Sequence, residues 1–192
     1  MTARAAHLNM SRTRLPVTTA TVFAITAAAT TLQYFFPLLP LFERQPGALA
    51  AHEYWRLITP IFLHREGWRQ IVFDFTALAI IGTIVERIFG GRRWLALYFA
   101  AGVAGELAGF AWKPLGAGSS VAICGLLGAL AAWLLRNPRP MQSRFGGIVI
   151  LIGAVILTAL RDLHGPPLLA GIVLGWVMLR GDSQQSPASI QR

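Results

Sequence analysis

The sequence is poor in charged residues and almost without cysteine. Only 13% of its 192 residues are charged, whereas soluble domains average about 25%. Hydrophobic residues make up 55%, and the mean hydropathy is +0.56. The single cysteine, Cys124, excludes an intramolecular disulfide and a cysteine-based metal site. This composition argues against a soluble domain and against a disulfide-stabilised secreted one.

The hydrophobic residues fall in blocks close to the roughly 17–25 residues that cross a bilayer as a helix. The sequence therefore predicts an all-α polytopic membrane protein with six transmembrane helices. The last two spans are joined only by the LHGPP region, which predicts a tight hairpin. The predicted spans are residues 17–38, 70–89, 94–112, 119–135, 145–163 and 164–180.

The net charge of +9 follows the predicted topology rather than marking a nucleic-acid surface. With a cytoplasmic N-terminus, 11 of the 17 basic residues lie in cytoplasmic segments. This positive-inside bias places both termini in the cytoplasm. The first 14 residues carry three arginines ahead of a long apolar run, which favours a signal-anchor over a cleaved signal peptide.

Three regions are predicted along the chain. Residues 1–16 form a basic cytoplasmic N-terminus, 17–180 a six-helix membrane domain, and 181–192 a disordered polar tail in the cytoplasm. Between the first two helices, residues 39–69 form a long loop rich in Phe, Tyr and Trp. Such a segment is expected to lie in the outer membrane interface. A partly helical extracellular loop is the alternative.

Two hydroxyl groups and a histidine stand at predicted helix ends. Ser119 and Ser120 open the fourth span, where serine is a common N-cap as well as a candidate nucleophile. His164 opens the sixth span, above the small residues Gly171 and Gly175 that allow close helix packing. A serine needs an adjacent base, so contact between the two helix ends would permit acyl chemistry. Asp162 lies two residues before His164, and this spacing alone does not bring the carboxylate into contact with the histidine ring.

Further polar residues lie within the spans. Gln70 and Asp74 share one face of the second span, where they could stabilise an oxyanion or simply bond the neighbouring loop. Glu86 is expected to pair with Arg87, Arg92 or Arg93 at the cytoplasmic face. Glu106 could mark an ion path, although it has no predicted partner in another span.

Four motifs together resemble the rhomboid family of intramembrane serine proteases. HEYWRLITPIFLH (52–64) resembles the loop before the family's second helix, and GTIVERIFGGRRWLALYFAAG (82–102) the stretch joining its second and third helices. GSSVAICGLLGAL (118–130) resembles the nucleophile motif. LHGPPLLAGIVLG (163–175) resembles the motif that carries the general base. The resemblance covers roughly residues 50–180.

The resemblance implies a catalytic dyad of Ser120 as nucleophile and His164 as general base. It also implies an oxyanion hole made by the Ser120 backbone N–H and Gln70, with Asp74 contributing only as a neutral acid. His64 matches the first histidine of the family's H…H…N pattern, and Gly118 lies on the substrate side of the nucleophile motif.

The sequence departs from the family pattern at three positions. Gln70 stands where the family usually has His, Asp74 where it has Asn, and Val121 where it has Gly after the serine. The loss of one oxyanion donor typically lowers the rate about 10²–10³-fold, which weakens an enzyme without abolishing its activity.

The resemblance therefore implies a protease of a bacterial plasma membrane that cleaves transmembrane proteins near the outer face. It needs no cofactor and no metal, and its partners are substrate proteins and the lipid bilayer, not nucleic acid. Two alternatives stay open: a catalytically weak or inactive rhomboid-like protein that binds single-span membrane clients, and a small transporter.

Overall fold

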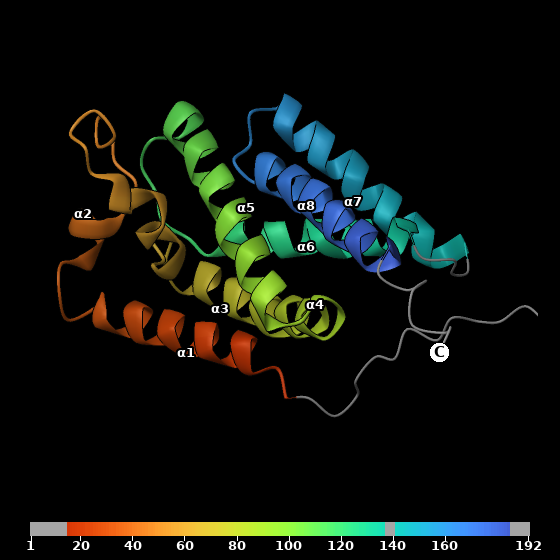
Figure 1. Ribbon diagram of the computed structural model, residues 1–192. Helices are drawn as coiled ribbons and strands as arrows, with labels where there is room; N and C mark the ends of the chain where they lie inside the picture. The colour runs from red at the N-terminus through yellow and green to blue at the C-terminus, as the bar shows by residue number, and fades with distance from the viewer. Residues whose placement is uncertain (1–14, 137–140, 185–192) are drawn as a thin grey trace, which may run out of the picture.

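The computed structural model describes residues 15–136 and 141–184, and this part of the chain is helical without a β-strand (Figure 1). The prediction of an all-α protein is confirmed for these residues. A π-helical turn, Leu78–Gly82, joins α3 and α4 into one continuous helical stretch. The α-helices are α1 (Val17–Leu32), α2 (Leu38–Phe42), α3 (Trp68–Ala77), α4 (Thr83–Phe89), α5 (Gly91–Trp112), α6 (Ser120–Arg136), α7 (Met141–Ala159) and α8 (Gly165–Gln184).

The long helices alternate in direction. α1, α5 and α7 run toward one end of the bundle, and the α3–α4 stretch, α6 and α8 run back (Figure 1). α6 is the central helix, because most of its residues are buried, whereas only Gly147 and Ala154 are buried in α7. The start of α6 and the start of α8 consequently lie at the same end of the bundle.

Small residues set the distance between α6 and α8. A Cβ atom at Gly171 would overlap the Gly125 carbonyl group, and one at Gly128 would overlap the Leu168 carbonyl oxygen. At Gly175 a Cβ would lie 2.9 Å from Cα of Ala129. The close approach predicted from the glycine spacing is thus confirmed, and it fixes the first turns of the two helices relative to each other.

Two helices, Gly91–Trp112 and Met141–Ala159, are long and apolar enough to cross a membrane by length and composition. Three shorter helices are also apolar, namely Val17–Leu32, Ser120–Arg136 and Gly165–Arg180. The number of spans stays a prediction.

Several predicted boundaries need correction. The first helix ends at Leu32 rather than at residue 38, and α7 ends at Ala159. A turn over residues 160–164 therefore separates α7 from α8. α8 continues to Gln184, so residues 181–184 are helical and not part of a disordered tail. Residues 185–192 of that tail, and 1–14 of the N-terminal region, lie outside the described residues.

The segment between α1 and α3 is held by polar contacts to one arginine. Nε of Arg56 donates to Glu53 Oε2 at 2.5 Å, and its Nη atoms donate to the carbonyl oxygens of Glu43 and Pro40 at 2.5 and 3.1 Å. Two short 3-10 helices, Tyr54–Leu57 and Thr59–Phe62, complete the segment. Its placement in the membrane interface stays a prediction.

Glu86 has a different partner from the arginines predicted for it. Its carboxylate accepts hydrogen bonds from the backbone N–H groups of Thr18 and Thr19 at 2.8 and 2.7 Å, and from the Thr19 hydroxyl at 2.7 Å. The first N–H groups of a helix have no partner within the helix. Glu86 therefore caps the N-terminus of α1 and attaches that helix to α4.

Candidate active site

The structure brings Ser120 and His164 together. Ser120 is the first residue of α6 and His164 directly precedes α8, so the close packing of these helices places both side chains at one end of the bundle. Nε2 of His164 lies 3.0 Å from Oγ of Ser120. Both residues are half-buried. A hydroxyl within hydrogen-bond reach of an imidazole is the arrangement that nucleophilic catalysis requires.

Asp162 contacts the histidine, a contact that its place two residues before His164 did not by itself require. Its Oδ1 accepts hydrogen bonds from the His164 backbone N–H at 2.9 Å and from Nδ1 of the ring at 2.7 Å. Burial opposes the charged form of this carboxyl. The two hydrogen bonds from His164 and the nearby ammonium group of Lys113 outweigh burial, so the pKa of Asp162 lies below its usual value. Three residues, not two, are linked in this site.

Asp74 lies on the other side of the serine in a buried polar cluster. Its Oδ2 accepts hydrogen bonds from the Ser120 backbone N–H and from the Ser119 hydroxyl, both at 3.1 Å. Nε2 of His64 lies 3.3 Å from the same oxygen, and Nδ1 of His64 lies 2.9 Å from the Thr30 hydroxyl. Thr30 was not predicted as a site residue, and Ser119 was considered only as the alternative nucleophile to Ser120. The buried threonines of α1, at positions 19, 26 and 30, mark its inward face by their helical spacing.

Gln70 faces the loop before α6 rather than the Ser120 N–H. Its Nε2 donates to the Ala117 carbonyl oxygen at 3.1 Å, and its Oε1 accepts from the Glu66 N–H at 2.9 Å. Any side chain at Gly118 would overlap the Gln70 amide group. The glycine is therefore needed for this close approach, and its own N–H donates to the Pro60 carbonyl oxygen at 3.1 Å.

A cavity of about 520 Å³ adjoins the serine and the histidine. Asp74 and Gln70 contribute to its wall from α3, and Gly118 contributes from the loop before α6. A peptide segment entering the cavity would meet the Ser120 hydroxyl directly. In the described part of the chain, no three His, Cys, Asp or Glu side chains gather where they could hold a metal ion.

Val121 fits against a glycine on the neighbouring helix. The side chain is buried, and a Cβ atom at Gly105 of α5 would lie 2.8 Å from its Cβ. Pro167 of α8 borders the same place. The bulk of the valine, at the position where the family motif has glycine, is thus accommodated by the missing side chain of Gly105.

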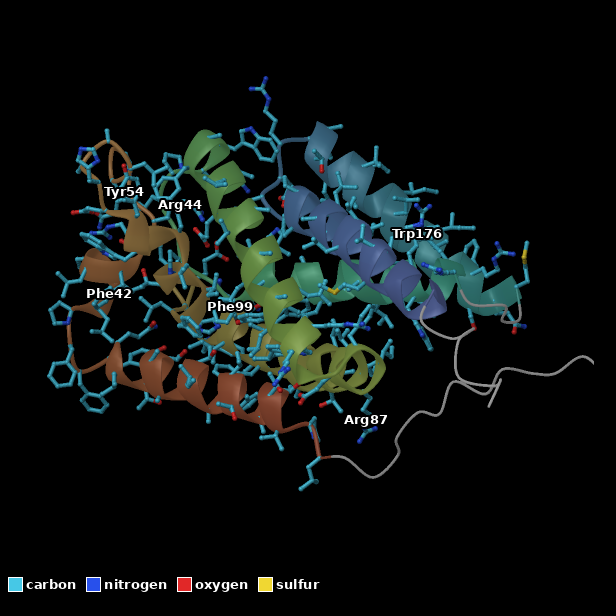
Figure 2. The ribbon with its side chains drawn as sticks, viewed as in Figure 1. Phe42, Arg44, Tyr54, Arg87, Phe99 and Trp176 are labelled. Atoms are coloured by element: carbon cyan, nitrogen blue, oxygen red, sulfur yellow. The ribbon has the colours of Figure 1, made fainter. Side chains whose placement is uncertain are left out.

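Glu106, a candidate for an ion path, is paired instead with Arg44. Nη1 of Arg44 lies 2.5 Å from Glu106 Oε2, and both side chains are buried. Figure 2 labels Arg44 where the segment after α2 meets α5. Arg44 also donates from Nε to the Lys113 carbonyl oxygen at 2.9 Å, and its backbone pairs with Gly116. Arg44 thereby attaches the loop before α6 to α5.

The comparison with known proteins shows the family of this chain. A Rhomboid domain description matches residues 51–181. The chain belongs to the rhomboid family. The match contains both Ser120 and His164, and a rhomboid family member is a membrane protein.

Three relatives illustrate the range of this family. "Rhomboid protease GluP" of Bacillus subtilis (strain 168) is 41% identical over 110 residues, which cover 57% of this chain and 22% of the relative. "Putative rhomboid protease YdcA" of the same strain is 34% identical over 113 residues, covering 57% and 56%. "Inactive RHOMBOID-like protein 8" of Arabidopsis thaliana is 29% identical over 102 residues, covering 52% and 29%. The chain thus spans about half or less of the length of each rhomboid relative.

Proposed function

We propose that this rhomboid family member is an intramembrane serine protease. The observation that carries the proposal is the 3.0 Å distance between Nε2 of His164 and Oγ of Ser120 at the wall of a cavity. Ser120 Oγ attacks the scissile carbonyl carbon while His164 takes the hydroxyl proton. The tetrahedral intermediate then collapses to an acyl-enzyme, and His164 passes the proton to the leaving amine. Water then attacks the acyl-enzyme. His164 takes a proton from this water and returns it to Ser120 Oγ as the acyl bond breaks.

The oxyanion is held by the Ser120 backbone N–H and the Gln70 amide. In the free protein these donors bond Asp74 and the Ala117 carbonyl oxygen, at 3.1 Å in each case. Catalytic hydrogen bonds often form only when substrate is bound. Substrate binding therefore includes a rearrangement in which both donors turn toward the cavity, and Asp74 adds a donor only when it carries a proton.

The proposed substrates are transmembrane proteins, cleaved near the outer face of a bacterial plasma membrane. The positive-inside distribution supports six spans with both termini in the cytoplasm. In that orientation the first residues of α6 and α8 lie near the outer face. The aromatic segment 39–69 then lies in the outer interface, where Tyr54 and Trp55 are exposed. Two bacterial relatives are named as rhomboid proteases, which supports this assignment.

A non-proteolytic protein that binds single-span membrane clients is the second candidate. The observation that favours it is the bond from the Ser120 N–H to Asp74, which occupies an oxyanion donor. A relative named as inactive belongs to the same family. This second function would use the same fold, and the binding of clients would not need the Ser120 hydroxyl.

A fluorophosphonate probe tests the two candidates. We expect covalent labelling of the wild type in detergent or liposomes, and none of Ser120→Ala or His164→Ala. Ser119→Ala is the matched control, since it removes the neighbouring hydroxyl and is expected to remain labelled. Labelling that survives Ser120→Ala would contradict the nucleophile, and an unlabelled wild type would support the client-binding protein.

A further inference from the structure

We propose that Asp162 is a positioning residue that orients His164, so that this rhomboid operates with a Ser120–His164–Asp162 triad rather than a dyad. The proposal rests on the proposed function of Ser120 and His164. It extends that function by assigning a third residue, on the turn between α7 and α8, to the same site.

The hydrogen bonds of Asp162 fix the histidine in two ways. The same Oδ1 atom accepts from the His164 backbone N–H at 2.9 Å and from ring Nδ1 at 2.7 Å. A carboxylate only accepts hydrogen bonds, so the proton of this bond belongs to Nδ1. In the neutral ring Nε2 is then unprotonated, and its lone pair faces Oγ of Ser120 at 3.0 Å. Asp162 thus selects the tautomer that a general base requires.

The backbone of the turn holds Asp162 in this position. Arg161 has a φ of 56°, a left-handed conformation that is uncommon for a residue with a side chain. Both backbone groups of the next residue are bonded. The Asp162 N–H donates to the Leu157 carbonyl oxygen at 2.8 Å, and the Asp162 carbonyl oxygen accepts from the Gly165 N–H at 3.1 Å. A Cβ atom at Gly165 would overlap the Thr158 backbone. The carboxylate is therefore built into the turn.

The negative charge of Asp162 also favours its role in orienting His164. Partial burial opposes ionisation of Asp162, but the hydrogen bonds from His164 and the nearby charge of Lys113 lower its pKa, so the carboxylate is ionised at neutral pH. Lys113 Nζ lies 3.7 Å from the other carboxylate oxygen, Oδ2, and more than half of the lysine side chain is exposed. The histidine therefore bonds Oδ1 without competition from the lysine. When His164 takes the serine proton, the adjacent negative charge stabilises the imidazolium ion. The other charged residues lining the cavity are Arg44, Glu66, Arg69, Asp74 and Glu106.

The experiment compares the rate of fluorophosphonate labelling of wild type, Asp162→Asn, Asp162→Glu and Glu53→Gln. Asp162→Asn is expected to lower the first-order labelling rate about 10–100-fold without weakening probe binding, because the serine loses an oriented base. Asp162→Glu is expected to recover part of the rate. Glu53→Gln removes a negative charge from a position outside the cavity and is expected to react like the wild type.

Two further readouts separate orientation from a merely structural role. The pH profile of the labelling rate is expected to differ between the wild type and Asp162→Asn, because the variant lacks the carboxylate that bonds the His164 ring. Nitrogen-15 NMR of His164 is expected to find the proton on Nδ1 in the wild type and a mixture of tautomers in Asp162→Asn.

The outcomes distinguish this inference from the proposed function. Equal rates and equal pH profiles for wild type and Asp162→Asn, with labelling still lost in Ser120→Ala, would overturn the triad and leave the protease intact. If the wild type is not labelled, the protease proposal fails and the NMR experiment decides the inference alone. A proton on Nε2 of His164 in the wild type would then overturn it.

Discussion

The backbone N–H of Ser120 donates a hydrogen bond to Oδ2 of Asp74 at 3.1 Å. The proposed mechanism assigns this N–H to the oxyanion, so the carboxylate competes with the substrate for it. An ionised Asp74 would also repel the developing negative charge. Under the proposed mechanism, Asp74 in this conformation would therefore slow the attack by Ser120.

Asp74→Asn is expected to raise the cleavage or labelling rate at neutral pH about tenfold or more. The amide carries no charge and can donate a hydrogen bond to the oxyanion, and one such donor is typically worth about 10²–10³ in rate. Labelling kinetics at fixed probe concentration measure the effect. A fall of a hundredfold would contradict this explanation and would mean that the carboxyl group itself is required.

The buried pair of Arg44 and Glu106 is expected to dominate the stability of the loop before α6. Arg44→Met leaves the buried Glu106 carboxyl without its partner, which should cost about 3–5 kcal/mol. Thermal unfolding in detergent measures the loss. Arg65→Gln breaks the half-exposed pair with Glu43 and serves as the control, with an expected cost below about 1 kcal/mol.

A double variant, Arg44→Met with Glu106→Leu, checks the physical reason. It removes both charges, so most of the lost stability should return. A double variant as unstable as Arg44→Met alone would mean that the arginine acts through its bond to the Lys113 carbonyl oxygen instead.

The packing of α6 against α8 is expected to tolerate no side chain at Gly171. Gly171→Ala places a methyl group on the Gly125 carbonyl group, which should cost about 1–3 kcal/mol and reduce activity by separating Ser120 from His164. Gly153→Ala on α7 is the matched control, because no atom lies within 4 Å of its added Cβ. Equal melting temperatures for the two variants would contradict the close packing.

The Asp162 carboxylate is expected to make stability depend on pH in acid. Its pKa is lowered in the folded protein, so its contribution is present above the unfolded value of about 3.9 and is lost as the pH falls through the folded value. The carboxylate is partly exposed, which limits the effect to below about 1 kcal/mol. Asp162→Asn should therefore melt slightly below the wild type at pH 7 and together with it near pH 2. A difference that grows in acid would contradict the sign.

Features set by local pattern were predictable from the sequence. The helices follow from the blocks of apolar residues, and the close packing of α6 and α8 follows from the glycine spacing, both of which are read from neighbouring positions in the sequence. The rhomboid resemblance added the pairing of Ser120 with His164, which lie 44 positions apart.

Features set by the tertiary path of the chain were not predictable. Contact between Asp162 and His164 depends on the left-handed backbone at Arg161, which no residue type signals when the position is not glycine. The pair of Arg44 and Glu106 joins positions 62 apart, and it forms because the segment after α2 folds back onto α5. The cap of α1 by Glu86 has the same origin.

Mapping the fluorophosphonate adduct by mass spectrometry tests the central claim most directly. The peptide that contains the start of α6 carries two adjacent serines, and fragmentation distinguishes them. A Ser120–His164 pair predicts a single adduct on Ser120 that disappears in His164→Ala. An adduct on Ser119, or a Ser120 adduct formed equally fast without His164, would contradict it.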